Sequence, residues 1–341
     1  MIKLKKHGVI LKPTNNNFET RSVLNPGVCQ DGQNVHLIYR AIDENYLSSL
    51  GYARLNGPTT VDERWDKPFM FPKYKVEKCG IEDPRITKIK DTLYMTYVVH
   101  NCRDAITCFS YGDDLFNLKR GHLISPKIPY KEAGKIFQFS KLKDKYYFFE
   151  SFYQKYSEPN VLIWHKDCIL FPEKINGKYA MLQRILPDIQ LMYFGDFSEL
   201  ENKYFWINNI MHLAETVIME AQHGFESRHL GGGCPPIKTE AGWLLIYHSA
   251  QARNKGRIYY GGAALLDYKN PLKVIARLPY PILSPEENYE TTGIVNNVAF
   301  PTGSAIFDNV LYIYYGAADK YVAVASININ ELINELHKHK V

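Results

Sequence analysis

Short apolar and aromatic runs, each preceded by a polar turn, recur along the chain. The runs are rich in Tyr, Leu and Ile, a composition that favours β-strands, and the turns in front of them carry Asp, Asn or Gly. The five runs are His36–Arg40, Leu93–Tyr97, Lys178–Leu182, Trp243–His248 and Leu311–Tyr315. Strand-rich units repeated at such intervals predict an all-β fold, a five-bladed β-propeller.

The interval between the second and third runs is the longest, and it contains one more similar run, Lys145–Phe149. This run is either part of an insertion in one blade or the mark of a sixth blade. Too little chain separates it from the next run for four more strands, so we expect an insertion around residues 130–165.

Helical periodicity is scarce. Leu332, Ile333 and Leu336 lie at helical spacing within Ile327–Lys340, which predicts a C-terminal helix capped by Asn328 or Asn330. The stretch from Glu199 to Gln222 fits a helical face and also a strand, and the pattern leaves both open. No linker or low-complexity segment divides the chain, so residues 1–341 are expected to form a single catalytic domain.

Composition narrows the range of partners. The net charge of +5 is spread along the chain without a long basic run, which argues against a nucleic-acid partner. The N-terminus shows no signal peptide, and no span fits a membrane. The six cysteines lack metal-binding spacing, so we expect them to be reduced and mostly buried in a cytoplasmic protein.

The segment Gly80–Thr87 places two carboxylates and a guanidinium within four residues, just before a strand-like run. Pro84 is expected to restrict Asp83 to an extended conformation and hold it in one orientation. Asp83 is therefore the best candidate for a general acid in sugar chemistry. The competing interpretation is a plain turn in which Asp83 pairs with Arg85.

Other candidates lie at the ends of the repeated strands, which converge near the axis of a propeller. Arg40 and His248 each end a run, and Arg184 and Asp319 follow the third and fifth runs. His229 precedes three consecutive glycines, whose free N–H groups are suited to an anion. A hydrolase needs a carboxylate to activate water, whereas a phosphorolytic enzyme needs cations for phosphate, so the balance of charges separates the two.

Several segments together resemble glycoside hydrolase family 130, the β-mannoside phosphorylases and related β-mannosidases. The matching segments are Leu24–Gly27, Tyr39–Ala41, Leu50–Ala53, Gly80–Thr87, Leu170–Tyr179, Gly231–His248, Asn297–Pro301 and Tyr314–Asp319. The resemblance implies a five-bladed propeller, in agreement with the repeat count.

The resemblance also implies roles for residues. Asp83 is the expected general acid, whose proton reaches the glycosidic oxygen through a sugar hydroxyl while phosphate attacks the anomeric carbon with inversion. The expected substrate contacts are Asn25 and Asp319, with Arg85 and Tyr289 as further candidates. The positions matching the phosphate pocket are Arg40, Lys166, Arg184, His229 and His248.

The expected activity is phosphorolysis of short β-mannosides, first of all β-1,2-linked ones, to α-mannose 1-phosphate. Two alternatives stay open: an inverting β-mannosidase with Glu226 or Glu220 as base, and a glycan-binding propeller without catalysis. Inorganic phosphate is the expected co-substrate, with no metal and no other cofactor. An oligosaccharide is the expected partner, without nucleic acid or membrane, and a homo-oligomer is left open.

Overall fold

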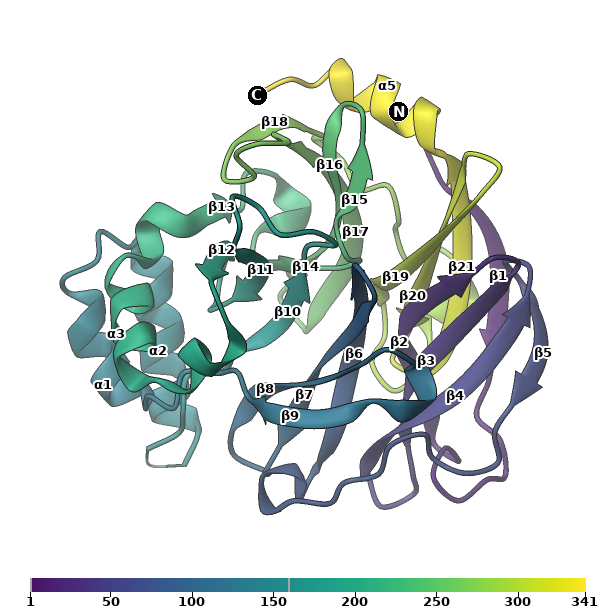
Figure 1. Ribbon diagram of the computed structural model, residues 1–341, viewed down its shortest axis with the longest axis horizontal. Helices are drawn as coiled ribbons and strands as arrows, with labels where there is room; N and C mark the ends of the chain where they lie inside the picture. Colours follow the sequence, from purple (N-terminus) through teal and green to yellow (C-terminus); the bar gives the residue numbers. More distant parts are fainter. Residues whose placement is uncertain (1, 159) are drawn as a thin grey trace.

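The chain folds mainly into antiparallel strands. A computed structural model describes residues 2–158 and 160–341. Its strands fall into five groups, which follow one another around the middle of the molecule in Figure 1. The first two groups form one continuous sheet, but a single parallel pair, Ser48 with Gly80, joins them.

The groups follow the order of the sequence, except that the first strand of the chain belongs to the last group. Groups one and two are β2 (Ser22–Asp31), β3 (Asn34–Ile42), β4 (Ser48–Asn56) and β5 (Thr60–Arg64), then β6 (Gly80–Ile89), β7 (Thr92–His100), β8 (Ala105–Gly112) and β9 (Lys119–Leu123). Groups three and four are β10 (Lys166–Leu170), β11 (Tyr179–Arg184), β12 (Ile189–Phe194) and β13 (Val217–Met219), then β14 (His229–Gly232), β15 (Ile237–Thr239), β16 (Gly242–Ala252), β17 (Arg257–Leu266) and β18 (Val274–Arg277). Group five is β19 (Ala299–Phe307), β20 (Val310–Ala317), β21 (Tyr321–Asn328) and β1 (Lys5–Leu11).

The N-terminal strand completes the last group. β1 pairs antiparallel with β21, in a register that places Lys5 opposite Ser326. Segments from the two ends of the chain therefore share one sheet, and the ladder of hydrogen bonds between β1 and β21 holds the N-terminal segment in the last group.

The five predicted runs are confirmed as strands. They lie in β3, β7, β11, β16 and β20, one in each group and each between two antiparallel neighbours. Their aromatic and aliphatic side chains are almost entirely buried, as with Tyr39, Tyr97 and Tyr315. This position explains why these runs gave the strongest signal, since a strand covered on both faces must be apolar along most of its length.

The predicted insertion is confirmed, and it is helical. The run Lys145–Phe149 lies in α2 (Asp144–Tyr156), which follows α1 (Tyr130–Phe137). Figure 1 shows both helices beside α3 (Lys203–Met211), outside the third group of strands. An aromatic run is compatible with either structure, because burial of one face is enough to order it.

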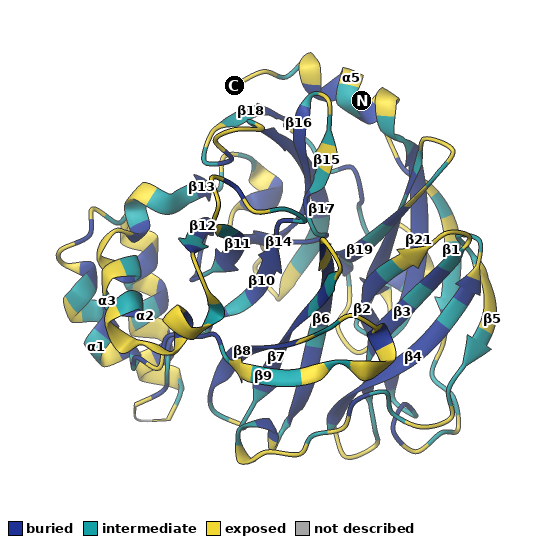
Figure 2. Cartoon of the chain, in the orientation of Figure 1, coloured by how far each residue is buried: buried dark blue, intermediate teal, exposed yellow. Residues whose placement is uncertain are grey.

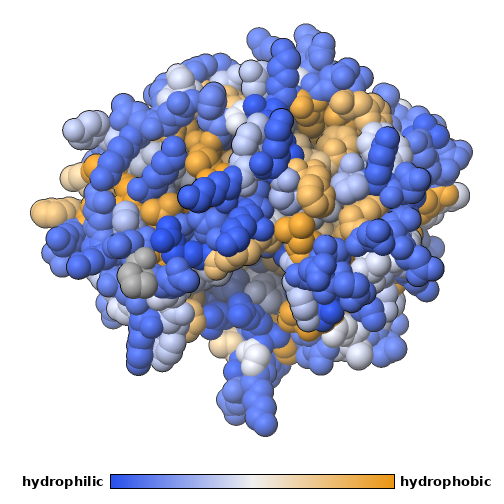
Figure 3. Space-filling model, turned by 90° about the horizontal axis from the view of Figure 1, so that it is seen from below, coloured by the Kyte–Doolittle hydropathy of each residue, from blue (hydrophilic) through white to orange (hydrophobic). Residues whose placement is uncertain are grey.

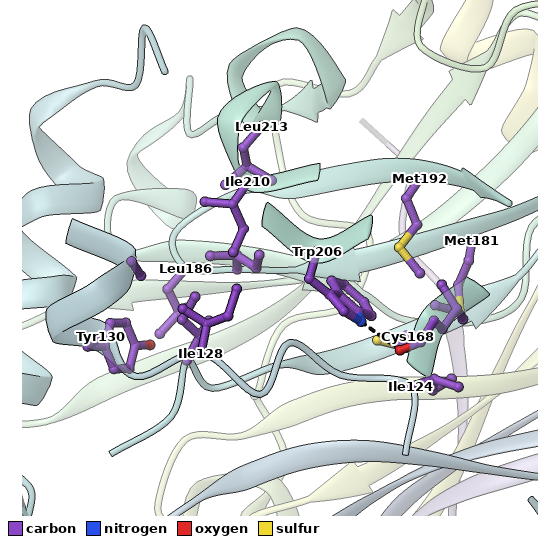
Figure 4. Close-up of a cluster of buried hydrophobic side chains, with 14 of the residues drawn as sticks. Ile124, Ile128, Tyr130, Cys168, Met181, Leu186, Met192, Trp206, Ile210 and Leu213 are labelled. Atoms are coloured by element: carbon purple, nitrogen blue, oxygen red, sulfur yellow. Dashed lines mark hydrogen bonds between the residues drawn. The ribbon is translucent and has the colours of Figure 1, made fainter. Parts of the chain in front are cut away.

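A hydrophobic cluster joins the insertion to the third group of strands. Figure 4 shows Tyr130 and Ile128 from the insertion together with Met181 and Met192 from the sheet. Trp206 of α3 is buried between them, and its indole N–H donates to the carbonyl of Leu200 at 2.7 Å. The insertion therefore packs into the body of the fold.

The remaining helical segments settle two other expectations. The C-terminal helix is confirmed as α5 (Ile329–His337), and the side chain of Asn328 caps it by accepting from the N–H groups of Asn330 and Glu331. The stretch from Glu199 to Gln222, which fitted a helix and also a strand, contains both kinds of element. They are the 3₁₀ turn Phe197–Glu201, α3, the 3₁₀ turn Leu213–Thr216 and β13. The remaining 3₁₀ turns are Lys75–Glu77, Leu115–Asn117 and Gly224–Glu226. The remaining α-helix is the short α4 (Asn288–Thr291).

The expectation for the cysteines is wrong at two of the six positions. Cys79 and Cys102 form a disulfide. Gly80 and His100 are paired across β6 and β7, which brings the residues just beyond that pair to a Cα–Cα distance of 5.2 Å. The other four cysteines are free, with Cys29 partly buried and three others buried as expected.

Buried residues concentrate in the strands, and exposed ones in the connecting loops and on the outer faces of the helices (Figure 2). The face seen in Figure 3 is covered mostly by hydrophilic side chains, with smaller hydrophobic areas between them. Within the described part of the chain, no helix combines the length and apolar character needed to cross a bilayer.

Candidate active site

Three side chains of the site project from irregularities in the first strands of their groups. Asn25, Asp83 and Asp167 have φ angles of 47°, 50° and 53°, in the left-handed region. Each lies where the pairing with the next strand shifts register, in β2, β6 and β10. Such bulges redirect a side chain, and Asn and Asp tolerate this backbone better than most residues.

The expectation of an extended Asp83 is therefore wrong. A following proline disfavours the right-handed helical region, but the bulge between Glu82 and Arg85 carries Asp83 into the left-handed one. The pattern shows which conformation Pro84 disfavours, while the pairing of β6 with β7 selects among the others. The prediction that Asp83 is held in one orientation still agrees with the structure.

These side chains meet at a cavity of about 290 Å³. Strands of all five groups line it, and the first strand of every group contributes at least one residue. Seven of the sequence-predicted residues border this cavity: Asn25, Arg40, Asp83, Lys166, Arg184, His229 and Asp319. Residues separated by up to three hundred positions are thus brought to one place.

Asp83 is held by its neighbours on one side. The amide of Asn25 donates to Oδ1 of Asp83 at 2.8 Å, and Nη1 of Arg40 lies 3.8 Å from the same oxygen. Asn25 itself needs Gly316, where a Cβ would lie 2.0 Å from its Oδ1. Because Oδ1 is occupied as an acceptor, the proton of a protonated Asp83 belongs on Oδ2.

Arg85 was predicted to contact substrate, but the structure places it elsewhere. It is 2% exposed and does not border the cavity. Its guanidinium donates to the carbonyls of Asp83 and Pro84 at 3.2 Å and to that of Gly233 at 2.8 Å. Arg85 therefore fixes the backbone of the bulge that carries Asp83, and it ties β6 to the segment after β14.

Two of the predicted cations share one buried carboxylate. Glu82 accepts from Nη2 of Arg40 at 2.8 Å and from Nζ of Lys166 at 3.1 Å. Burial opposes ionisation of Glu82, but these two cations outweigh it and lower its pKa to about 2. Burial would likewise lower the pKa of Lys166, yet Glu82 and Asp83 raise it, so the ammonium stays charged.

Arg184 is positioned by Asp167 and His248. Its Nη1 lies 2.8 Å from Oδ2 of Asp167 and donates to Nε2 of His248 at 3.2 Å. Nδ1 of His248 in turn donates to the carbonyl of Gly232 at 3.1 Å, which leaves Nε2 as the acceptor. The Nε of Arg184 is buried and has no partner among the described residues, so it is free for a ligand.

The predicted cationic role of His248 is not supported. His248 is fully buried, outside the cavity, and burial together with Arg184 and Arg85 lowers its pKa to about 3, against the opposing effect of Asp167. It acts as a neutral acceptor that orients Arg184. His229 does border the cavity, but burial and the neighbouring Arg184 hold its pKa well below the ordinary value, so it too is neutral.

Three further candidates lie away from the cavity. Tyr289 is not in its lining; it is half-buried against the hydrophobic core, and its hydroxyl lies 3.4 Å from that of Tyr315. Glu226 is fully buried and bonded to Arg277 and Tyr247, and Glu220 pairs with Lys143 near the surface. Neither glutamate borders the cavity.

A family model described as beta-1,4-mannooligosaccharide phosphorylase matches residues 5–338. The chain belongs to glycoside hydrolase family 130. The resemblance inferred from the motifs is thereby confirmed.

Relatives in the family cover nearly the whole of this chain. A 1,2-beta-oligomannan phosphorylase of Thermoanaerobacter sp. (strain X514) is 36% identical over 344 residues, 97% of this chain and 99% of that protein. A beta-1,2-mannobiose phosphorylase of the same organism is 36% identical over 91% of each chain. The structure of the beta-1,2-mannobiose phosphorylase from Listeria innocua in complex with beta-1,2-mannobiose aligns with a TM-score of 0.74 at 24% identity, over 99% of this chain and 100% of that one, and shows the same fold.

Sequence reasoning missed part of the lining of this family-130 cavity. The helical insertion contributes an aromatic wall, and β17 contributes a cation and a tyrosine. The missed residues include Phe149, Tyr153, Trp164, Asp167, Arg257 and Tyr259. Asn25 and Asp83 each precede a proline in the first strand of a group, but Asp167 precedes Cys168, so this pattern gave no signal for it. The wall from α2 had no such signal, because its place depends on how the insertion packs.

Asp319 lies in the turn between β20 and β21 and borders the cavity. Burial raises its pKa to about 6, and the negative charges of Asp83 and Glu82 add to the rise, while Arg40 opposes it. Among residues 2–158 and 160–341, no group of three or more His, Cys, Asp or Glu side chains is arranged to hold a metal ion.

We expect Asp319 to make stability depend on pH. In the unfolded chain this carboxyl ionises near 3.8, and in the native protein near 6, so the native state binds more protons between these values. Its contribution is present below about pH 4 and is lost as the pH rises through 6, on the order of 3 kcal/mol at most. Urea unfolding should show Asp319→Asn gaining stability relative to the wild type over this range. A difference that is constant with pH would contradict the assignment.

Proposed function

We propose that this protein is a phosphorylase of short β-mannosides, acting first of all on β-1,2-linked manno-oligosaccharides. The observation that carries the proposal is that Asp83 borders the same cavity as the cations Arg40, Lys166 and Arg184. The names of the relatives support it, since those with the highest coverage are phosphorylases of β-1,2-linked mannosides.

In the proposed reaction, Asp83 supplies the proton that the departing sugar oxygen requires. Asn25 occupies Oδ1, so the proton leaves from Oδ2, relayed through a sugar hydroxyl to the glycosidic oxygen. An oxygen of phosphate attacks the anomeric carbon from the opposite face as the bond to the leaving sugar breaks. The products are α-mannose 1-phosphate and the shortened sugar, and Asp83 is left as the carboxylate.

The cations bind and orient the phosphate. Arg184 offers an unpaired Nε, and Arg40 and Lys166 keep their charge through Glu82. Enclosure in the cavity removes competing water and strengthens these contacts. Inorganic phosphate is the co-substrate, and the chemistry requires neither a metal nor another cofactor. Asn25 and Asp319 are placed to contact the mannosyl unit, and Trp164, Tyr153 and Phe149 to contact the leaving sugar.

The five groups of strands correspond to the blades of a five-bladed β-propeller. The first strand of each group borders the cavity, as inner strands around an axis do, and β1 closes the ring by joining the last blade. The whole chain then acts as one catalytic domain. A cytoplasmic location stays a prediction, and the disulfide between Cys79 and Cys102 is a reason to test it.

The direct test is incubation with β-1,2-mannobiose in the presence and absence of phosphate. We expect mannose and α-mannose 1-phosphate only when phosphate is added, with the sugar phosphate followed by ³¹P NMR. Equal release of sugar in both samples, without a sugar phosphate, would establish hydrolysis instead.

Replacing Glu226 separates a structural glutamate from a catalytic base. Glu226→Gln breaks a fully buried pair with Arg277, so we expect the free energy of unfolding to fall by about 3–5 kcal/mol while kcat is retained. Glu173→Gln, which removes an exposed partner of Lys238, is the matched control and should cost less than about 1 kcal/mol. Loss of turnover in a folded Glu226→Gln variant would favour the hydrolase.

A further inference from the structure

The cavity contains one carboxylate that the proposed reaction does not use. Asp167 is 5% exposed and borders the cavity among the cations assigned to phosphate. Nη1 of Arg184 lies 2.8 Å from its Oδ2, Nε2 of His248 lies 3.6 Å from the same atom, and Nη2 of Arg85 lies 3.8 Å from Oδ1. The carboxylate of Asp167 therefore places a negative charge inside the expected phosphate site.

Oδ2 of Asp167 keeps a free acceptor position. The contact with Arg184 is an ion pair without a hydrogen bond, and Oδ2 has no hydrogen-bond partner in the described part of the chain. Space for this oxygen depends on Gly231, where a Cβ would lie 2.5 Å from it. Burial opposes ionisation of Asp167, but Arg184 and the other nearby cations outweigh it and lower its pKa, so the carboxylate stays charged.

A fixed carboxylate repels a fully deprotonated anion but accepts a hydrogen bond from one that carries a proton. Phosphate near neutral pH retains at least one P–OH group, and arsenate resembles it. Sulfate has nearly the same size and shape but carries no proton. Because charge-assisted hydrogen bonds are strong and a buried unpaired contact is costly, one carboxylate is enough to separate these ions.

We propose that Asp167 makes the anion subsite selective for protonated tetrahedral oxyanions, by accepting the P–OH hydrogen of phosphate and excluding sulfate. The inference rests on the proposed function and deepens it. The proton of phosphate is then held on the oxygen nearest Asp167. The unprotonated oxygens are left to Arg184 and to the anomeric carbon, so Asp167 is also a positioning residue for the nucleophile.

The experiment measures binding of inorganic phosphate, arsenate and sulfate to the whole protein by calorimetry at one ionic strength. We expect phosphate and arsenate to bind with similar affinity, and sulfate about 10- to 100-fold more weakly. In Asp167→Asn, whose amide donates as well as accepts, the ratio of phosphate to sulfate affinity should fall towards one. Asp167→Ser, which removes the same charge, replaces it if the first variant does not fold.

Asp188→Asn is the matched control, because it removes another buried carboxylate from the segment after Arg184 that does not border this cavity. Its affinity ratio should equal that of the wild type. Equal binding of phosphate and sulfate by the wild type, or an unchanged ratio in folded Asp167→Asn, would overturn the inference. Absence of both phosphate binding and sugar phosphate formation in the wild type would instead refute the proposed function.

Discussion

Asp83→Asn is expected to lower kcat for phosphorolysis of β-1,2-mannobiose by a factor of about 10²–10⁴. The amide keeps the size of the side chain and still accepts from Asn25, but it has no proton to give to the departing oxygen. KM for phosphate should change little, because the nearest cation to Asp83, Arg40, is held mainly by Glu82. Steady-state kinetics with both substrates varied will separate the two parameters.

The control for Asp83→Asn is a substrate with a leaving group that needs no protonation, such as an activated aryl β-mannoside. Its turnover should fall far less than that of mannobiose if the lost function is proton donation. An equal fall for both substrates would show that Asp83 positions the sugar instead. A wild type that binds mannobiose without turning it over would identify a glycan-binding protein.

Arg184→Met is expected to raise KM for phosphate by about 100-fold or more. The change removes a charge-assisted contact worth roughly 1.5–3 kcal/mol and also leaves Asp167 without its nearest cation. Without that cation, repulsion between the carboxylate of Asp167 and the incoming dianion outweighs the hydrogen bond between them, which adds to the loss. KM for mannobiose should change much less, since it is expected to depend on other residues of the cavity.

The double variant Arg184→Met/Asp167→Asn tests that explanation. Removing the carboxylate as well should recover part of the lost phosphate affinity, so the two changes will be strongly non-additive. Full additivity would show that Arg184 and Asp167 act independently. A normal KM for phosphate in folded Arg184→Met would place the phosphate elsewhere in the cavity.

Local sequence patterns were sufficient to predict the strands and the helix whose formation depends mainly on residues close together in the chain. The five apolar runs became strands because each lies between two neighbouring strands and is buried along most of its length. The C-terminal helix was readable from Leu332 and Leu336 on one face and from its cap, Asn328. The insertion was located by chain length alone, but its helical structure was not, since an aromatic run such as that in α2 is ambiguous.

Within the site, residue type was a good guide to location and a poor guide to charge. Seven predicted residues border one cavity, but His248 and His229 are neutral because burial and Arg184 oppose a second positive charge. Arg85 has the right chemistry for a substrate contact, yet it bonds to three backbone carbonyls. Tyr289 is half-buried and packs against the hydrophobic core, away from the cavity.

Sequence alone therefore identified the family, the five strand repeats and Asp83 as the candidate acid, because these depend on residue types and their order along the chain. Folding determined which groups carry charge, which side of Asp83 is free to hold a proton, and that Asp167 stands among the cations. These properties arise from burial and from partners distant in the chain. Whether a carboxylate or an imidazole is charged depends on how deeply it is buried and on the charges near it.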